Sequence, residues 1–230
     1  MAMNPVDCIL QELMKRADIE QARNIARYLK MPVHSVFGVK LPFIHKAVDK
    51  CTKEVDTNGL IQIMQELWKL GKHETRVAAI DVMKKYAKEG DVKTALKIAS
   101  EWIEEVDTWA HMDPLGSNCI GTLLLRDSGI ENILQDWASA ENFWRRRASI
   151  LPYLHLSKKT VYKGEFAERI LGAIKPHIDD EEFFVGKAAA WVLREFSKRE
   201  PERAGEFIRE NRNKMTSLVL REGSRKLEDI

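Results

Sequence analysis

The chain has 230 residues, of which 44% are hydrophobic and 31% are charged. This composition is typical of a folded globular protein and excludes a largely disordered chain. The formal net charge is only +2, so the overall charge indicates neither nucleic acid nor an anionic membrane as a partner.

Targeting signals and ligand clusters are absent from the printed sequence. The first residues mix acids and bases in an amphipathic pattern, and no apolar run is long enough to cross a bilayer. We therefore expect no membrane contact. The three cysteines, Cys8, Cys51 and Cys119, are scattered, and so are the six histidines. This spacing predicts reduced thiols in a cytoplasmic protein, and neither a metal site nor a cofactor.

Nearly every segment has the apolar spacing of a helix, and runs of alternating polarity are absent. Pro32 ends the second helix, and Pro42 stands early enough in the third to be tolerated there. The sequence therefore predicts an all-α protein. In chain order, the clearest helices are expected over Val6–Met14, Ala22–Leu29, Gly59–Leu70, Glu74–Lys88 and Val92–Val106.

Three of the predicted helices share a cluster of small residues followed by larger apolar ones. The clusters lie in Val77–Met83, Arg147–Tyr153 and Lys187–Leu193. The second and third clusters begin 40 positions apart, at Arg147 and Lys187. Helix pairs that recur about every 40 residues are typical of a HEAT-like α-α superhelix, a solenoid with one concave face. We expect a single domain of such repeats over residues 1–230. The alternative is an irregular helical bundle in which the clusters coincide by chance.

A tryptophan and an aspartate stand four residues apart at Trp109 and Asp113. Because Ile103, Val106 and Trp109 recur at helical spacing, we expect a helix that places the indole and the carboxylate on one face. Pro114 follows at once and predicts a helix end or break beside the pair. A core tryptophan next to a solvated or capping aspartate is the alternative.

Basic residues stand directly before the small residues of two of these clusters, at Arg145–Arg147 and at Lys187. At matching repeat positions they would project into one groove and contact phosphates. The alternative is an ordinary solvated helix face.

In its order and spacing of motifs, the chain resembles the AlkD-type family of DNA alkylation repair glycosylases. The resemblance implies HEAT-like repeats around a concave, positively charged cleft for double-stranded DNA. The matching pieces are Ala26–Lys30, Phe37–Val39 before Pro42, Glu66–Trp68, Ala78–Tyr86, Asn142–Trp144 before Arg147, and Phe183–Phe184 before Trp191–Phe196.

The resemblance also assigns site residues. It implies that Asp113 is the catalytic aspartate and that Trp109 and Trp191 are tryptophans of the cleft. Arg147 matches an arginine that contacts a DNA phosphate, and Tyr28 matches a tyrosine lining the same cleft. From the basic stripe we add Lys187 and Arg146 as DNA-binding residues. The chain departs from the family pattern at Ala110–Met112 and at Phe43–His45.

These residue types suit the hydrolysis of an N-glycosidic bond. Breaking the bond between sugar and base builds positive charge on the sugar, which a carboxylate stabilises. A nearby arginine would lower the pKa of Asp113, and the faces of two indoles would attract a cationic purine. We expect a monomeric, monofunctional hydrolase that removes N3- or N7-alkylated purines and joins the nucleoid when bound to DNA. Two alternatives remain: a non-catalytic binder of damaged or branched DNA, and a protein-binding scaffold.

Overall fold

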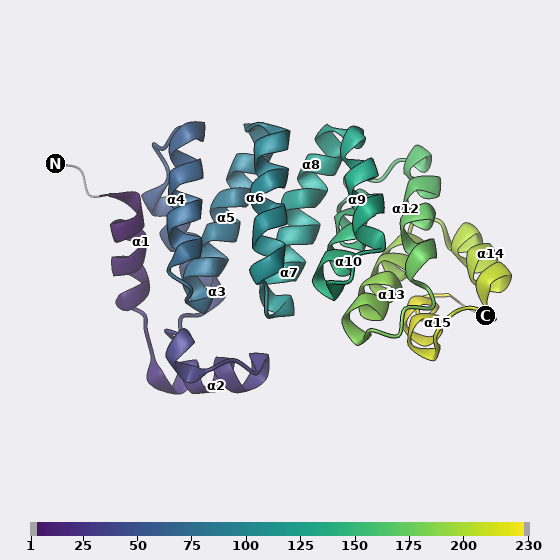
Figure 1. Ribbon diagram of the computed structural model, residues 1–230, viewed down its shortest axis with the longest axis horizontal. Coiled ribbons are helices and arrows are strands. Elements are labelled where there is room, and N and C mark those ends of the chain that lie inside the picture. Colours follow the sequence, from purple (N-terminus) through teal and green to yellow (C-terminus); the bar gives the residue numbers. More distant parts are fainter. Residues whose placement is uncertain (1–3, 228–230) are drawn as a thin grey trace. The chain divides into compact units, whose positions relative to one another are not determined.

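The computed structural model describes residues 4–227, and every regular element in that range is helical (Figure 1). The all-α prediction is therefore confirmed. None of the helices within residues 4–227 has the length and apolar character that crossing a membrane requires. These residues form two compact units, one reaching to Ala95 and the other beginning at Leu96. Whether the two units form the single repeat domain expected from the sequence is not decided by this division, so the single domain stays a prediction.

The α-helices of the first unit are α1 (Pro5–Met14), α2 (Ile19–Leu29), α3 (Leu41–Cys51), α4 (Thr57–Lys69) and α5 (His73–Glu89). Four of these five, α1, α2, α4 and α5, begin and end within a few residues of the predicted bounds. Helix α4 packs along α5, and α3 packs against both α1 and α5.

A buried carboxylate fixes the turn between α2 and α3. Glu74 has no exposed surface, and its two oxygens accept hydrogen bonds from the backbone N–H groups of Phe37, Gly38 and Val39 at 2.7–3.1 Å. Gly38 has φ +86°, and a Cβ built there would lie 2.0 Å from the carbonyl oxygen of Asp18. Only glycine fits this turn, because any side chain would meet the backbone.

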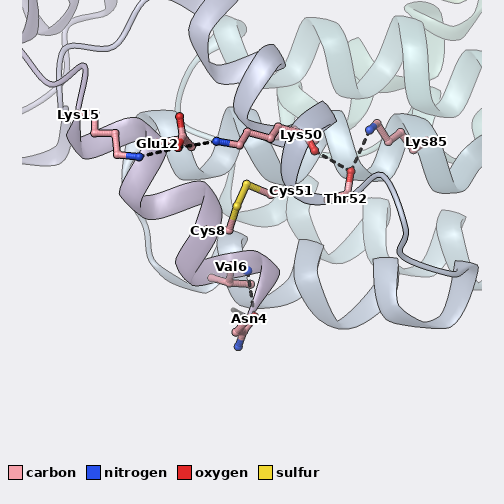
Figure 2. The surroundings of a disulfide bond; sticks show 10 residues. Asn4, Val6, Cys8, Glu12, Lys15, Lys50, Cys51, Thr52 and Lys85 are labelled. Carbon is pink, nitrogen blue, oxygen red and sulfur yellow. Dashed lines mark hydrogen bonds and ion pairs between the residues drawn. A yellow bond between two sulfur atoms is a disulfide. The ribbon is translucent and has the colours of Figure 1, made fainter. Parts of the chain in front are cut away.

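The expectation that all cysteines are reduced is wrong for two of them. Cys8 in α1 and Cys51 at the end of α3 form a disulfide, with their Cα atoms 5.9 Å apart (Figure 2). Beside the disulfide, Glu12 Oε1 forms ion pairs with two lysines, Lys15 Nζ at 2.7 Å and Lys50 Nζ at 3.0 Å. The sequence spacing of 43 residues gave no hint of this pairing, which arises because α1 packs on α3. The expectation of a cytoplasmic protein rested partly on reduced thiols and loses that support.

The second unit continues the pattern of neighbouring helices packed side by side. It begins within α6 (Val92–Glu105) and contains the following α-helices: α7 (Trp109–Pro114), α8 (Gly121–Arg126), α9 (Glu131–Ala138), α10 (Phe143–Ile150), α11 (Pro152–Leu156), α12 (Ala167–Ile174), α13 (Phe183–Ser197), α14 (Pro201–Asn211) and α15 (Ser217–Gly223).

Small residues bring two of these helices together, as the repeat pattern predicts. Helix α10 packs against α9 and α13, and α13 packs against α12, α14 and α15. The clusters at Ala148–Ile150 in α10 and Ala188–Ala190 in α13 are buried. Two of the three predicted repeat copies therefore lie on helices in direct contact.

Candidate active site

The Trp109 segment is helical, but it starts a helix of its own. Helix α6 ends at Glu105, and Thr108 has extended backbone before α7 begins at Trp109. The Thr108 hydroxyl caps α7 by accepting from the N–H of Ala110 at 3.3 Å. The continuous helix predicted through Val106 is therefore interrupted, because Thr108 supplies an N-cap. Trp109 and Asp113 still share one helix and one face.

The chain changes its helical form directly after Asp113. Pro114 ends α7, as predicted, and residues Leu115–Ile120 continue as a π-helix into α8. Proline has no N–H to donate, so an ordinary α-helical hydrogen bond is missing at this point. A Cβ added to Gly116 would lie 2.8 Å from the Leu151 side chain. The glycine thus lets the Leu151 side chain, at the junction of α10 and α11, pack closely against the π-helix that follows Asp113.

One cavity of about 290 Å³ collects most of the predicted site residues. Trp109 and Asp113 reach it from α7, Arg147 from α10, and Lys187 and Trp191 from α13. The remaining lining residues are Phe183, Phe184, Arg194 and Glu222. The structure therefore brings together predicted site residues that lie up to 82 positions apart in the sequence, from Trp109 to Trp191.

Asp113 is held in place through only one of its two oxygens. Its Oδ1 accepts from Arg147 Nη2 at 2.7 Å and from Arg147 Nε at 2.9 Å. No other hydrogen bond to the carboxylate occurs among residues 4–227, so Oδ2 remains available to a molecule in the cavity. The side chain is 19% exposed.

Burial raises the pKa of Asp113 above the ordinary value of an aspartate, because a charged carboxylate loses hydration there. The charge and the hydrogen bonds of Arg147 lower the pKa, as expected from the sequence, but burial is the larger effect. The site thus holds a carboxylate that is less acidic than a solvated one and is fixed in orientation.

Arg147 is buried, with 4% of its surface exposed, and its guanidinium is occupied within the protein. Besides the two bonds to Asp113, its Nη1 donates to the carbonyl oxygen of Phe184. The Phe184 ring lies 5.0 Å from the ring of Trp144 and 6.1 Å from that of Phe143, so an aromatic cluster fixes this carbonyl. The predicted phosphate contact of Arg147 stays a prediction; the geometry shown is that of a residue that positions Asp113.

Helix α13 presents a stripe of three residues to the cavity: Lys187, Trp191 and Arg194. Their spacing of four and three positions puts them on one helical face. Glu222, from α15, lies 3.9 Å from Lys187 Nζ and 3.5 Å from Arg194 Nη1. The exposed ring of Phe183 lies under Lys187, 5.8 Å from its Nζ.

Two other predicted DNA-binding residues are found elsewhere. Arg146 does not line the cavity: it pairs with Asp180 at 2.8 Å and donates to the carbonyl oxygens of Ala140 and Glu141. Tyr28 lies in α2 of the first unit and is 72% exposed. The DNA-binding roles of both residues stay predictions.

Four lining residues were given no role from the sequence: Phe183, Phe184, Arg194 and Glu222. Arg194 could have been found, because it follows Trp191 by three positions and so shares its face. Glu222 had no such signal, since it reaches the cavity only through the packing of α15 on α13. No group of histidine, cysteine, aspartate or glutamate residues that could hold a metal ion occurs within residues 4–227.

The sequence family of the chain follows from a comparison over nearly its whole length. The model of a family described as "DNA alkylation repair enzyme" matches residues 9–227. The chain belongs to this family. The resemblance seen in the motifs is thereby confirmed. No curated protein matches the chain.

Solved structures share the fold of this family member. A protein from Enterococcus faecalis, described as a predicted DNA alkylation repair enzyme, superposes with a TM-score of 0.78 at 23% identity and covers 94% of this chain and 98% of its own. AlkD2 from Streptococcus mutans superposes with a TM-score of 0.66 at 16% identity and covers 90% of this chain and 99% of its own. At these identities the likeness shows a common fold.

Proposed function

We propose that this family member is a DNA glycosylase that hydrolyses the N-glycosidic bond of cationic N3- or N7-alkylated purines in duplex DNA. The observation that carries the proposal is the state of Asp113. One of its oxygens is anchored to Arg147, the other accepts no hydrogen bond from residues 4–227, and the residue lines a cavity together with two indoles and Lys187.

The chemistry follows from this arrangement. The bond between C1′ and the purine nitrogen breaks, and its electron pair neutralises the positive charge of the alkylated base. The sugar then carries oxocarbenium-like charge, which the free oxygen of Asp113 stabilises at close range. Water adds its oxygen to C1′, and its proton passes to Asp113 and on to solvent. An alkylated purine is a good leaving group, so the step needs no acid to protonate it.

The other lining residues suit a cationic substrate on a polyanion. The ring faces of Trp109 and Trp191 attract the charged base and sugar, and Lys187 supplies a partly exposed ammonium group for a phosphate. Arg147 keeps Asp113 oriented. In this proposal the protein acts as a monomer on DNA in the cytoplasm, with Tyr28 and Arg146 as further contacts.

The decisive experiment measures base release. Duplex DNA treated with a methylating agent is incubated with excess protein, and free 7-methylguanine and 3-methyladenine are separated by chromatography. Heat-inactivated protein gives the spontaneous background at each time point. Release above this background is the expected result. DNA binding without release would favour the non-catalytic DNA binder, and the absence of both would favour the protein-binding scaffold.

A further inference from the structure

A single carboxylate occupies the cationic side of the cavity. Glu222 Oε2 lies 3.9 Å from Lys187 Nζ and 3.5 Å from both Arg194 Nη1 and Arg225 Nη1, while Oε1 lies 3.4 Å from Arg221 Nε. Four cations thus surround one negative charge. A phosphate oxygen of DNA would seek the same position, because it too is an anion that matches several basic side chains.

These contacts are looser than those of the other ion pair in the cavity. Arg147 holds Asp113 through hydrogen bonds of 2.7 and 2.9 Å, whereas the distances from Glu222 to its four cations are all 3.4 Å or longer. The difference indicates that the Arg147–Asp113 pair is fixed, whereas the cations around Glu222 can exchange this carboxylate for another anion. Lys187 is 40% exposed, and Arg221 and Arg225 are each 68% exposed, so the cations can turn toward an incoming ligand.

The carboxylate remains charged in this setting. Lys187 is the largest influence on Glu222 and lowers its pKa, with further lowering by Arg221 and Arg225. The cavity therefore carries its own counter-charge. Of its charged lining residues, three are cations (Arg147, Lys187, Arg194) and two are acids (Asp113, Glu222).

We propose that Glu222 stands in for a DNA phosphate: it holds Lys187 and Arg194 while the cavity is empty and must give them up when the DNA backbone enters. This inference rests on the proposed function, because it assumes that duplex DNA is the ligand. The consequence is weaker binding to DNA in general, since every phosphate at this position has to compete with a carboxylate. Glu222 is a positioning residue with no part in bond cleavage.

The test replaces Glu222 by Gln, which keeps the size of the side chain and removes its charge. Affinity for an undamaged duplex is measured by fluorescence anisotropy between about 50 and about 200 mM salt. We expect Glu222→Gln to bind roughly three- to tenfold more tightly than the wild type, with a slope of log K against log salt that is steeper by about one. Glu210→Gln, an exposed change on α14 with the same effect on net charge, should match the wild type.

A double variant identifies the cation through which Glu222 acts. If Glu222 restrains Lys187, the gain in affinity from Glu222→Gln should shrink by at least half in a Lys187→Gln background. An unchanged melting temperature for Glu222→Gln would show that the comparison concerns folded protein. Should the variant melt lower, Glu222→Asp, which keeps the charge, must bind as the wild type does.

The outcomes separate the two proposals. If the wild type binds duplex DNA and Glu222→Gln binds with the same affinity and the same salt slope, the counter-charge inference is overturned while the proposed function stands. If neither protein binds at the lowest salt, the proposed function fails and the inference fails with it. If Glu210→Gln tightens binding as much as Glu222→Gln does, only net charge is acting, and the inference is overturned.

Discussion

Glu74 in the first unit and Asp113 in the second are both removed from most of the solvent, but their oxygens are used differently. Both oxygens of Glu74 accept backbone N–H bonds, three in all, and the side chain has no exposed surface. Asp113, which lines a cavity, receives its two bonds on one oxygen, from Arg147, and its other oxygen accepts none from residues 4–227. The comparison shows how burial alone fails to identify a reactive group. What distinguishes the two sites is the second oxygen of Asp113, to which no group within residues 4–227 donates a hydrogen bond.

The largest effect should come from removing the charge of Asp113. In Asp113→Asn, single-turnover excision of 7-methylguanine should slow by roughly 10²-fold or more, as for the loss of other preorganised electrostatic groups. Affinity for duplex DNA should hardly fall, because a carboxylate repels phosphate. Excision and binding are measured on the same preparation.

The matched control for this change is Asp136→Asn, an exposed position on α9. It alters the net charge equally and should excise at the wild-type rate. Wild-type excision by Asp113→Asn would remove the residue from the mechanism and would end the contrast with Glu74.

The second prediction concerns folding at Glu74. Glu74→Gln offers one acceptor oxygen where the turn needs two, and its amide N–H₂ would face a backbone donor. We expect the free energy of unfolding to fall by roughly 2–4 kcal/mol, the cost of leaving buried donors unsatisfied. Denaturant titration measures it.

Glu66→Gln, an exposed change on α4, should unfold at the wild-type denaturant midpoint. The comparison would break if Glu74→Gln were as stable as Glu66→Gln, since Glu74 would then have no structural role at the turn.

A third buried titratable group, His177, should make the stability of the fold depend on pH, independently of Asp113 and catalysis. Its Nε2 lies 2.9 Å from Ser149 Oγ, while its Nδ1 is buried without a hydrogen-bond partner among the described residues. Burial lowers the pKa of His177 to about 4. An unfolded histidine titrates near 6.5. The unfolded chain therefore binds the proton first as the pH falls.

The contribution of His177 to stability is fully present above pH 6.5 and is lost as the pH drops from there toward 4. The shift corresponds to a loss on the order of 3 kcal/mol. His177→Gln keeps a partner for Ser149 and cannot titrate, so its free energy of unfolding should fall less than that of the wild type over this range. Parallel curves for the two proteins would contradict the prediction.

Much of the fold and of the site could be predicted because it depends on short-range spacing. Helical periodicity placed α1, α2, α4, α5 and α6 within a few residues, and the four-residue interval put Trp109 and Asp113 on one face. The clusters near Arg147 and Lys187 placed these residues on helices that pack together. Helix α13 carried both Lys187 and Trp191 into the cavity for the same reason.

What could not be predicted depends on contacts between distant segments. The Cys8–Cys51 disulfide requires α1 to pack on α3, and Glu222 reaches the cavity from the last described helix. The hydrogen bond from the Arg147 guanidinium to the carbonyl oxygen of Phe184 depends on how α10 packs against α13. No local pattern in the sequence encodes any of these three contacts.

The smallest expected effect is a shift in the pH dependence of excision. Burial raises the pKa of Asp113, and Arg147 partly opposes this. Because the reaction needs the ionised carboxylate, excision should decline with falling pH before the range near 3.9 where a solvated aspartate titrates. Arg147→Gln removes the opposing charge, so its decline should begin at a higher pH than in the wild type. Arg147→Lys keeps a positive charge and should stay closer to the wild type.

Rates are measured between about pH 5 and about pH 8, and spontaneous release is subtracted at each pH because acid itself promotes loss of purines. Near neutral pH, Arg147→Lys should excise only a few-fold more slowly than the wild type, since it loses one of the two hydrogen bonds to Oδ1 and keeps the charge. Two results would count against the assignment. One is a wild-type rate that shows no decline down to about pH 5, which would mean that burial leaves Asp113 close to an ordinary aspartate. The other is the same decline in all three proteins, which would mean that the titrating group is not the carboxylate that Arg147 holds.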